Sequence, residues 1–492
     1  MNLKEIASVL NTKMIINSKD CDIKDVSYNS KTAKVGDVFV CLTGEHTDGH
    51  DYAKMAVDNG AVAVVAQKEI DVDVPVIIVD DTKLALAQVA NALNDYPSQK
   101  LNLIGVTGTN GKTTVTHLIE NIFEKSGQRC GLIGTMGLRK SVNDTYHDAK
   151  HTTPQAPELQ RTLKSMLDDG IKNVVMEVSS HSLEQHRVGG CVFNGAVFTN
   201  LTQDHLDYHI TMANYARAKA KLFKSLKNNK ENRFAVVNAD DEYAYEMLKA
   251  VPDDVEIYTY GIKQEADVMA SDIAYSVEGV RFNCVTPSGS GVLQLQLVGE
   301  FSVYNALAAL SAGLLAGIDF ETCKKALEST KSVAGRFEVV SSKPLVIVDY
   351  AHTPDGLENV LKAAGQLRGE KSKLICLFGC GGDRDATKRP IMAHIAEKMA
   401  DKVIITSDNP RSEDPQQIIT DVLSGIQSLD QDRIFVEIDR RSAIELAIKM
   451  ASEDDIVVLA GKGHENYQIL KDETIHFDDR EEAVAALKKI KA

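Results

Sequence analysis

Short apolar runs and amphipathic stretches alternate along most of this chain, and their order predicts an α/β protein. Leu101-Asn102-Leu103-Ile104-Gly105 has the apolar content of a buried strand. In the segment 115–125, apolar residues recur at intervals of three and four positions, which is the spacing of one helix face. Further strands are expected at 37–42, 61–65, 173–178, 196–200, 234–238, 345–349, 374–378, 403–406 and 456–460. Alternation of this kind indicates mostly parallel sheets with helices on both faces.

Changes in this rhythm divide the chain into three expected domains. Residues 1–100 form an N-terminal mixed α/β domain, with a helix expected at 51–59. Residues 101–332 form a central domain with a mostly parallel sheet, in which short antiparallel strands are expected at 264–297 and a helix at 302–316. Residues 333–492 form a C-terminal Rossmann-like α/β domain. A chain of 492 residues is too long for a single hydrophobic core, which fits this division.

A glycine-rich segment, Val106-Thr107-Gly108-Thr109-Asn110-Gly111-Lys112-Thr113-Thr114, lies between the first strand and helix of the central domain. Such a turn binds phosphate, because its N–H groups and the positive end of the helix dipole face the anion. Lys112 is expected to reach the β- and γ-phosphates, and Thr113 to offer its hydroxyl to Mg²⁺. The segment departs from the general pattern G-x-x-x-x-G-K-[ST], because Val106 replaces the first glycine. A turn that merely caps the helix is the alternative.

Polar residues end several expected strands of the central domain, which is where ligands bind in folds with parallel sheets. Glu177, Asn200 and Asn238 occupy such positions. Glu177, Thr113 and a histidine of the segment 204–209 make a candidate Mg²⁺ site, since Mg²⁺ prefers oxygen ligands and keeps several waters. The alternatives are a salt bridge at Glu177 and structural roles for the histidines. The histidines near these strand ends are His181, His186, His205 and His209.

Composition and charge narrow the class of protein. The 43% hydrophobic and 25% charged residues are typical of a soluble globular protein. A net charge of −15 argues against nucleic-acid binding as the main function. The N-terminal residues lack the pattern of a secretory signal, and no apolar run approaches the ~20 residues of a membrane span, so we expect a cytoplasmic protein without membrane contact. The eight scattered cysteines predict reduced thiols rather than a metal site.

Motifs in all three expected domains resemble the Mur ligase family. They are the phosphate-loop segment 107–114, Glu177-Val178-Ser179-Ser180-His181, Asp204-His205-Leu206-Asp207-Tyr208-His209, the segment 215–223 with Lys219, Asn305, Gly335-Arg336-Phe337-Glu338, Asp349-Tyr350-Ala351-His352-Thr353-Pro354 and Asp408-Asn409-Pro410-Arg411. The resemblance extends nearly from end to end of the chain. The departure at Val106 is itself typical of this family.

The resemblance implies an ATP-dependent acid–amino-acid ligase of peptidoglycan precursor synthesis. ATP phosphorylates the D-glutamate γ-carboxylate of UDP-N-acetylmuramoyl-L-alanyl-D-glutamate, and the amine of meso-2,6-diaminopimelate attacks the resulting acyl phosphate. A tetrahedral intermediate then releases phosphate and leaves an amide. The expected partners are these two substrates, ATP and Mg²⁺, with no nucleic acid and no membrane, and the expected assembly is a monomer.

The resemblance also implies roles for the domains and for individual residues. Residues 1–100 would bind the UDP part of the substrate, residues 101–332 would bind ATP, and residues 333–492 would bind the amino acid. The implied catalytic residues are Lys112, Glu177, His205 and Lys219, and the implied metal ligands are Thr113, Glu177, His205 and Lys219 as its N6-carboxylated form. The implied ATP-binding residues are Thr109, Asn110, Gly111, Lys112, Thr113, Thr114, Asn305, Arg336 and Asp349. Those implied for the UDP-muramoyl dipeptide are Ser30, Glu45, His46, Thr47, Thr152, Thr153, Ser179, Gln185 and Arg187.

The amino-acid substrate can also be argued from charge. Diaminopimelate differs from lysine by a second carboxylate at its far end, and the two-pronged guanidinium of arginine binds a carboxylate in a way that the lysine ammonium cannot. Arg411 fits that role, and Glu465 is expected to receive the ammonium group. The residues implied for diaminopimelate are Arg389, Asp408, Asn409, Pro410, Arg411, Gly461 and Glu465. A surface arginine at a loop tip is the alternative for Arg411.

Other functions compete with this interpretation. Folylpolyglutamate synthetase is a relative that shares the ATP domain and the reaction type, but residues 1–100 and the segment 408–411 argue against it. A GTPase switch would need an Asn-Lys-x-Asp guanine motif, and the nearest segment, Asn229-Lys230-Glu231-Asn232, lacks the final aspartate. A purely structural ATP-binding scaffold is the remaining alternative.

Overall fold

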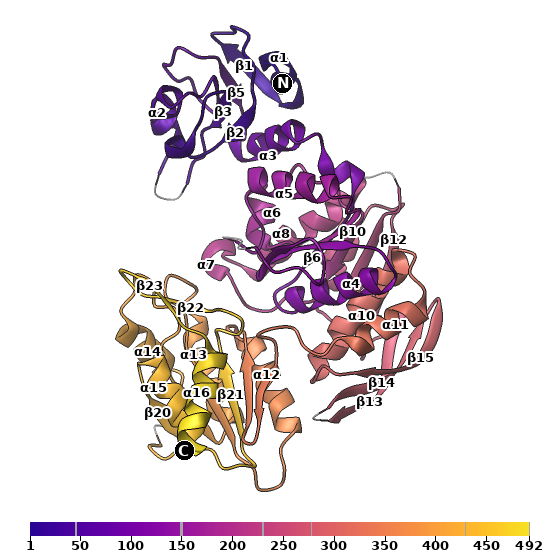
Figure 1. Ribbon diagram of the computed structural model, residues 1–492, viewed down its shortest axis with the longest axis vertical. Coiled ribbons are helices and arrows are strands. Elements are labelled where there is room, and N and C mark those ends of the chain that lie inside the picture. Colours follow the sequence, from indigo (N-terminus) through magenta and orange to yellow (C-terminus); the bar gives the residue numbers. More distant parts are fainter. Residues whose placement is uncertain (45–46, 148–150, 229–230, 277, 429, 492) are drawn as a thin grey trace.

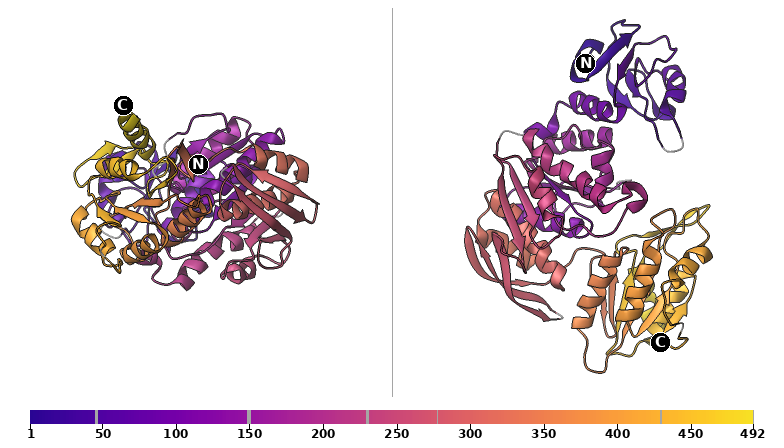
Figure 2. Two further views of the ribbon diagram at one scale, coloured as in Figure 1. Left: turned by 90° about the horizontal axis from the view of Figure 1, so that it is seen from below. Right: turned by 180° about the vertical axis from the view of Figure 1, so that it is seen from behind.

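The computed structural model describes the whole chain except residues 45–46, 148–150, 229–230, 277, 429 and 492. Three large sheets follow one another along the long axis of the molecule (Figure 1). The view from behind shows the same series, with the N-terminal sheet at one end and the C-terminal sheet at the other (Figure 2). These mixed and mostly parallel sheets confirm the predicted α/β class.

The N-terminal sheet has the strand order β1-β5-β4-β3-β2. Its strands are β1 (Thr12–Ile16), β2 (Asp25–Ser27), β3 (Asp37–Val40), β4 (Ala63–Ala66) and β5 (Val76–Val79), and only β1 pairs antiparallel among them. The helices α1 (Leu3–Val9), α2 (Ala53–Asp58) and α3 (Thr82–Leu93) pack against it. The prediction of a helix at 51–59 is wrong at its start, since α2 begins at Ala53. Residues Gly49–Tyr52 form a 3-10 turn instead, because the Asp48 carboxylate accepts the His50 N–H at 3.0 Å and starts the turn earlier.

The central sheet has ten strands in the order β15-β14-β13-β12-β11-β10-β6-β9-β7-β8. Six parallel strands form its middle: β6 (Asn102–Thr107), β7 (Cys130–Gly134), β9 (Asn173–Glu177), β10 (Gly195–Phe198), β11 (Phe234–Asn238) and β12 (Glu256–Gly261). Its edges are β8 (Gly137–Arg139) and the ribbon of β13 (Val268–Ser276), β14 (Gly279–Thr286) and β15 (Gly289–Leu295). The antiparallel pairing of β13, β14 and β15 confirms the expectation for 264–297.

Two apolar cores flank this sheet, because its middle strands are buried on both faces. One face packs against α4 (Lys112–Lys125), α10 (Glu300–Leu315) and α11 (Phe320–Ser329). The other packs against α5 (Ala156–Asp168), α8 (Met212–Lys224) and α9 (Ala244–Ala250). Two short helices, α6 (Ser180–Glu184) and α7 (Leu206–His209), follow β9 and β10 at the carboxyl ends of the strands.

The C-terminal sheet has the strand order β16-β17-β21-β18-β19-β20 and is parallel except for β16. Its strands are β16 (Glu338–Ser342), β17 (Leu345–Asp349), β18 (Leu374–Phe378), β19 (Lys402–Ile405), β20 (Ile434–Val436) and β21 (Ile456–Ala460). One face carries α12 (Pro354–Gln366), α13 (Lys388–Met399) and α14 (Pro415–Leu423), and the other carries α15 (Arg440–Met450) and α16 (Asp479–Lys491). A small hairpin, β22 (Tyr467–Ile469) and β23 (Thr474–His476), follows β21.

Candidate active site

The glycine-rich segment forms the predicted turn between β6 and α4. Gly108 and Gly111 have positive φ angles, and neither position has room for a side chain. A Cβ atom at Gly108 would lie 1.8 Å from Thr199 Oγ1, and one at Gly111 would lie 2.5 Å from Asn305 Oδ1. The turn therefore keeps its backbone close to its neighbours and its N–H groups at the start of α4, which is the geometry of a phosphate site.

Two lysine side chains converge on the carbonyl of Gly108. Lys112 Nζ donates to Gly108 O at 2.9 Å and to Thr109 O at 2.8 Å, and Lys219 Nζ donates to Gly108 O at 2.8 Å. Lys219 is fully buried on α8, with its ammonium 4.5 Å from the ring centre of Tyr215. Burial and the nearby charge of Lys112 hold the pKa of Lys219 well below its usual value. The two lysines therefore concentrate positive charge, or a reactive neutral amine, at the phosphate loop.

Glu177 ends β9 beside the phosphate loop and joins three hydrogen-bond donors. Its Oε1 accepts the Thr113 hydroxyl at 3.0 Å and the Thr135 N–H at 2.9 Å, while its Oε2 accepts the Thr135 hydroxyl at 3.0 Å. The carboxylate and hydroxyl oxygens of Glu177 and Thr113 are the hard donors that Mg²⁺ prefers. Within the described part of the chain, no cluster of three or more histidine, cysteine, aspartate or glutamate residues could hold a metal ion. A Mg²⁺ ion here would thus depend on phosphate oxygens and water for its other ligands.

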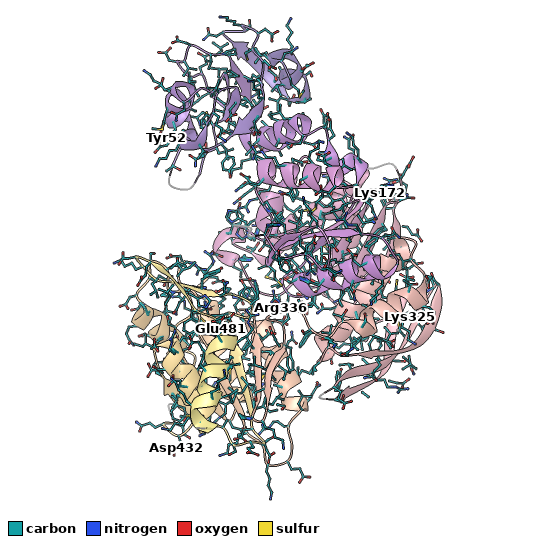
Figure 3. All side chains as sticks on the ribbon, in the orientation of Figure 1. Tyr52, Lys172, Lys325, Arg336, Asp432 and Glu481 are labelled. Atoms are coloured by element: carbon teal, nitrogen blue, oxygen red, sulfur yellow. The ribbon has the colours of Figure 1, made fainter. Side chains whose placement is uncertain are left out.

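A cavity of about 290 Å³ lies between the central and C-terminal sheets and is lined by six of the nine predicted ATP residues, whereas Thr109, Lys112 and Thr113 line the second cavity described below. The central part contributes Asn110, Gly111, Thr114 and Asn305, and the C-terminal part contributes Arg336 and Asp349. Arg336 lies at the junction of the two parts (Figure 3). Its Nη2 donates to Thr113 Oγ1 at 3.0 Å, and its guanidinium carbon lies 4.5 Å from the ring centre of Tyr350. The structure therefore brings together nucleotide-loop residues that are more than 200 positions apart in sequence.

Asp349 ends β17 on the same cavity and accepts the Phe337 N–H at 2.7 Å. Burial raises the pKa of this carboxyl, although the charge of Arg336 opposes the rise. Asn110 also spans the junction, since its Nδ2 donates to Asp355 Oδ2 at 2.6 Å. Thr109 lines the second cavity described next rather than this one, and its hydroxyl donates to Thr202 O at 3.2 Å.

A second cavity, of about 270 Å³, connects the phosphate loop with the loops predicted for diaminopimelate. Its lining includes Lys112, Thr113 and Glu177 from the central part. From the C-terminal part it includes Asp408, Asn409, Arg411, Gly461 and Glu465, which were predicted, and Arg384, Asp385, Lys388 and His352, which were not. One cavity therefore holds a candidate phosphate site and a cluster of arginines and carboxylates.

The carboxylates of this cluster are held by a buried lysine that the sequence analysis missed. Lys462 Nζ has no exposed surface and lies 3.2 Å from Glu465 Oε2, 3.1 Å from Asn409 Oδ1 and 3.5 Å from Asp408 Oδ1. Asn409 Nδ2 also donates to Glu465 Oε2 at 2.9 Å. Burial, followed by the charge of Asp408, raises the pKa of Glu465. Glu465 is thus already paired, and Lys462 neutralises part of the negative charge that an incoming ammonium would meet.

Arg411 lines this cavity, but Arg389 and Pro410 do not. Arg411 Nη1 donates to Gly382 O at 2.8 Å, which ties the loop after β19 to the loop after β18. Arg389 is buried on α13, where Nη1 lies 2.7 Å from Asp421 Oδ2 and Nη2 lies 2.9 Å from Glu413. Its Nη2 also donates to Gly381 O at 3.2 Å, so Arg389 supports the wall of the cavity from behind.

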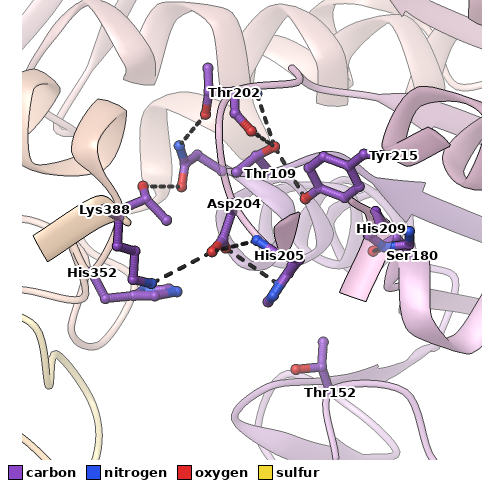
Figure 4. Close-up of polar contacts among 12 residues, drawn as sticks. Thr109, Thr152, Ser180, Thr202, Asp204, His205, His209, Tyr215, His352 and Lys388 are labelled. Carbon is purple, nitrogen blue, oxygen red and sulfur yellow. Dashed lines mark hydrogen bonds and ion pairs between the residues drawn. The ribbon is translucent and has the colours of Figure 1, made fainter. Parts of the chain in front are cut away.

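Asp204 links His205 to the C-terminal part of the chain (Figure 4). Its Oδ2 lies 3.3 Å from His205 Nε2, and its Oδ1 lies 3.5 Å from Lys388 Nζ on α13. Burial lowers the pKa of His205 to about 3, so the ring is neutral at neutral pH and can act as a ligand or an acceptor. Burial opposes ionisation of Asp204, but the positive charge of Lys388 and the hydrogen bond from the His205 backbone N–H lower its pKa. His205 faces the second cavity, as the predicted metal site requires.

The residues predicted for the UDP-muramoyl dipeptide fall into separate groups. Thr152 and Ser179 line the second cavity, and Thr153 is buried beneath them with its hydroxyl donating to Glu177 O at 2.9 Å. Gln185 and Arg187 line a smaller cavity of about 60 Å³ with Leu42 and Lys83 of the N-terminal part. In the N-terminal part itself, Ser30 is buried with its hydroxyl 3.4 Å from Met55 Sδ, and Thr47 is exposed. Glu45 and His46 lie outside the described residues.

Sequence signals could have found some of the missed residues. Arg384 and Asp385 follow β18, and Lys462 follows β21, so the rule that ligands bind at the carboxyl ends of parallel strands already applies to them. Thr135 follows β7 in the same way. Lys388 begins α13 and reaches the cavity only because the two parts of the chain meet there, and its position in sequence gives no such signal.

Comparisons with known proteins agree across the chain. Family models match residues 22–94 (Mur ligase family, catalytic domain), 106–313 (Mur ligase middle domain) and 335–463 (Mur ligase, glutamate ligase domain). The UDP-N-acetylmuramoyl-L-alanyl-D-glutamate–2,6-diaminopimelate ligase of Geobacillus thermodenitrificans is 47% identical over 496 residues, which cover 99% of this chain and 100% of that protein. A solved structure of a ligase of the same name has a TM-score of 0.67 at 38% identity and covers 96% of each chain.

A folylpolyglutamate synthase of Mycobacterium tuberculosis, solved with ADP, has a TM-score of 0.64 but only 18% identity. The match covers 77% of this chain and 91% of that one, and at this identity it shows a shared fold alone. Among the described residues, no helix is long and apolar enough to cross a membrane.

Proposed function

The chain belongs to the Mur ligase family, and from this premise we propose that it is an ATP-dependent ligase that adds meso-2,6-diaminopimelate to UDP-N-acetylmuramoyl-L-alanyl-D-glutamate. The new amide forms at the γ-carboxylate of D-glutamate. The observation that carries the proposal is the second cavity, because it joins Lys112, Thr113 and Glu177 to Arg411 and Glu465 in one space. A reaction that transfers a phosphoryl group to a carboxylate and then joins an amine needs both kinds of site side by side.

The nucleotide would bind in the cavity between the central and C-terminal parts, with its phosphates along 108–114. Lys112 now bonds to the carbonyls of Gly108 and Thr109, and it would exchange these bonds for β- and γ-phosphate oxygens. Arg336 and Asn110 come from opposite sides of the junction and would close over the phosphates and the sugar. Closure of this kind excludes water, which protects an acyl phosphate from hydrolysis.

Thr113 and Glu177 would hold Mg²⁺ together with the phosphates, and His205 and a carboxylated Lys219 complete the proposed ligands. Mg²⁺ would neutralise phosphate charge and so allow an anionic carboxylate to approach. Lys219 supports the modification through its burial, since a lysine with a lowered pKa presents a neutral amine. Its nitrogen would add to the carbon of CO₂ and lose a proton, which gives an anionic carbamate. Among the described residues, no carboxylate forms an ion pair with Lys219 that would compete with this reaction.

The reaction itself would proceed by two displacements. A γ-carboxylate oxygen attacks the γ-phosphorus of ATP, the bond to the β-phosphate oxygen breaks, and ADP leaves. The amine then attacks the carbonyl carbon of the acyl phosphate, and the tetrahedral intermediate expels inorganic phosphate and loses a proton from nitrogen. Lys112 lines the same cavity as Arg411 and Glu465 and would stabilise the negative charge that develops in both steps.

Arg411 would bind the second carboxylate of diaminopimelate, with Arg384 beside it on the same cavity. Asp408, Asn409 and Glu465 would receive the ammonium group at that end of the molecule. Lys462 limits the net negative charge of these groups, so they attract an ammonium group only weakly. Lysine, which has only an ammonium at this end, would therefore gain less binding free energy than diaminopimelate, whose carboxylate also pairs with Arg411. This arrangement supports diaminopimelate over lysine.

The remaining assignments follow the same proposal. The N-terminal part and the small cavity at Gln185 and Arg187 would hold the UDP-muramoyl end, with residues 1–100, 101–332 and 333–492 as the three functional domains. A monomer is the proposed working unit, as the resemblance to the family implies. The cytoplasm, where ATP and UDP-activated sugars occur, is the proposed compartment.

Phosphate release from ATP tests the proposal. The assay contains UDP-N-acetylmuramoyl-L-alanyl-D-glutamate and, in separate reactions, meso-diaminopimelate, L-lysine or no amino acid. We expect strong turnover only with diaminopimelate. Turnover with lysine alone would contradict the proposed pocket but keep the family, and turnover of a folate with glutamate would favour the synthetase alternative.

A further inference from the structure

A fully buried ion pair lies beneath the loops of the second cavity. Arg440 begins α15 and Asp479 begins α16, and neither side chain has exposed surface. Arg440 Nε donates to Asp479 Oδ1 at 2.8 Å, and Arg440 Nη2 donates to Asp479 Oδ2 at 2.6 Å. This is the bidentate geometry in which an arginine and a carboxylate fix each other's orientation.

The same guanidinium donates to two backbone carbonyls. Its Nη1 lies 3.3 Å from Ser407 O, and its Nη2 lies 3.0 Å from Ala460 O. Ser407 directly precedes Asp408, and Ala460 directly precedes Gly461, so each carbonyl lies at the root of one loop of the cavity. These loops follow β19 and β21, which are not neighbours in the sheet because β18 lies between them. Arg440 therefore connects two loops that strand pairing does not connect.

On the cavity side the same two loops are joined by Lys462, which lies 3.1 Å from Asn409 Oδ1 and 3.2 Å from Glu465 Oε2. Lys462 thus links the two loops on the side that faces the cavity, and Arg440 links them on the opposite side. A site that must distinguish two ends of a small charged molecule needs such rigid support, because a small displacement of its donors weakens binding.

Helix stability alone does not explain Arg440. A positive charge in the first turn of α15 faces the positive end of the helix dipole, which is unfavourable. The neighbouring Arg441 provides a comparison, since its Nη2 lies 2.8 Å from Glu482 on α16 and its side chain is 55% exposed. Arg441 joins the same two helices at the surface, so a link between α15 and α16 does not require a buried pair.

We propose that Arg440 and Asp479 are positioning residues that set the spacing between the loops 407–411 and 460–465 and thereby the affinity for the amino-acid substrate. This inference rests on the proposed function of the cavity. Neither residue lines the cavity, so both act through the loops. Asp479 fixes the orientation of the Arg440 guanidinium, and the guanidinium fixes the positions of the Ser407 and Ala460 carbonyls.

Arg440→Lys tests the inference most directly. The lysine keeps a positive charge for Asp479, but its single nitrogen cannot reproduce the planar fork that serves the carboxylate and both carbonyls. We expect the KM for diaminopimelate to rise at least about tenfold, with kcat and the KM for ATP changed less than about twofold. Arg441→Lys is the matched control and should leave all three constants unchanged. An Arg440→Lys variant that melts like the control and keeps its KM for diaminopimelate would overturn the inference.

A measurement on the unmodified protein covers the case in which the variant does not fold. Backbone amide hydrogen exchange should show protection of 407–411 and 460–465 without any ligand, because the pair holds the loops in advance. Asp479→Asn, which keeps the size of the side chain but removes its charge, should lose that protection in both loops together. Fast exchange of these loops in the unmodified protein would refute the inference. If the unmodified protein uses no amino acid, the proposed function fails, whereas the exchange result still decides the role of Arg440.

Discussion

Replacing Arg411 with alanine gives the sharpest test of the amino-acid assignment. Arg411 has φ of 51°, in the left-handed region. Alanine keeps the same backbone restriction as arginine, whereas glycine would relax the loop and change two properties at once. Arg411→Ala therefore removes the guanidinium with little other change to the backbone.

The expected effect can be worked from the contacts. A guanidinium that binds a carboxylate with two hydrogen bonds contributes about 1.5–3 kcal/mol per bond, and the lower value applies in a cavity open to water. The loss for diaminopimelate is then about 3 kcal/mol, or about a hundredfold in kcat/KM. The variant also loses the bond from Arg411 Nη1 to Gly382 O, at 2.8 Å, which costs about 1 kcal/mol. That second loss loosens the loop for any amino acid.

The assay must separate these two losses. Phosphate release gives kcat/KM for diaminopimelate, and L-lysine, as a substrate or an inhibitor, reports on the loop without a second carboxylate. We expect the binding of lysine to weaken about fivefold at most, and the KM for ATP to stay unchanged. Arg368→Ala is a control, since Arg368 follows the end of α12, pairs with Asp401 and lines neither large cavity.

Equal losses for diaminopimelate and lysine would refute the reasoning, because they would mean that Arg411 only supports the loop. An unchanged kcat/KM for diaminopimelate would remove Arg411 from the pocket altogether. Arg384 lines the same cavity and would then become the candidate for the second carboxylate.

Three further predictions concern the modification, the pH dependence and the core. If Lys219 is carboxylated, depleting CO₂ and bicarbonate should lower the rate of phosphate release, and adding bicarbonate should restore it. Labelling with ¹³CO₂ should give a carbamate NMR signal that is absent in Lys219→Arg. A rate that does not depend on CO₂ would contradict the modification. Burial lowers the pKa of His117 to about 4 in the folded protein, whereas the pKa of this histidine in the unfolded chain is near 6.5. Between these two values the unfolded chain binds a proton that the folded protein does not. The free energy of unfolding should therefore fall as the pH drops from 6.5 to about 4, by about 1 kcal/mol per pH unit for this site. The melting temperature of His117→Gln should therefore fall less over this range, and parallel pH curves for both proteins would show that His117 does not contribute. Leu377→Ala should lower the free energy of unfolding by about 2–5 kcal/mol in denaturant titrations, because the side chain is fully buried in β18; a loss below about 1 kcal/mol would mean that the core refills the space.

The sequence predicted the central strands well because they are buried on both faces. The apolar runs at 173–178, 234–238, 374–378 and 456–460 correspond to β9, β11, β18 and β21. Short strands at edges carry a weaker signal, since one side of the strand is exposed and few residues are apolar. The hairpin of β22 and β23, with only three residues in each strand, was missed for this reason.

The candidate site could be predicted as far as its residues follow strands. Glu177 and Asp349 end β9 and β17, and Asp408 and Gly461 follow β19 and β21 closely, so the position of the strand predicts the position of the side chain. Contacts between the central and C-terminal parts follow no such rule. The bond between Arg336 and Thr113 and the ion pair between Lys388 and Asp204 depend on how the parts meet, which no local pattern encodes.

Arg389 shows how the packing around a side chain bears on a prediction made from its motif position. Its motif position suggests a ligand, but its guanidinium is satisfied by Glu413 and Asp421 and lies outside the cavity lining. Sequence position gives the type of side chain near a site, whereas the direction of the side chain depends on its neighbours. A direct contact between Arg389 and the amino acid stays a prediction.

Arg336 lines both large cavities, and this shared side chain has a thermodynamic consequence. A ligand that orders Arg336 in one cavity changes the free energy of binding in the other, and the two affinities must change by the same factor, whichever ligand binds first. If a nucleotide tightens the amino acid tenfold, the amino acid tightens the nucleotide tenfold, and the coupling free energy is about 1.4 kcal/mol. The potency of an inhibitor directed at either cavity will therefore depend on how much of the other ligand is present.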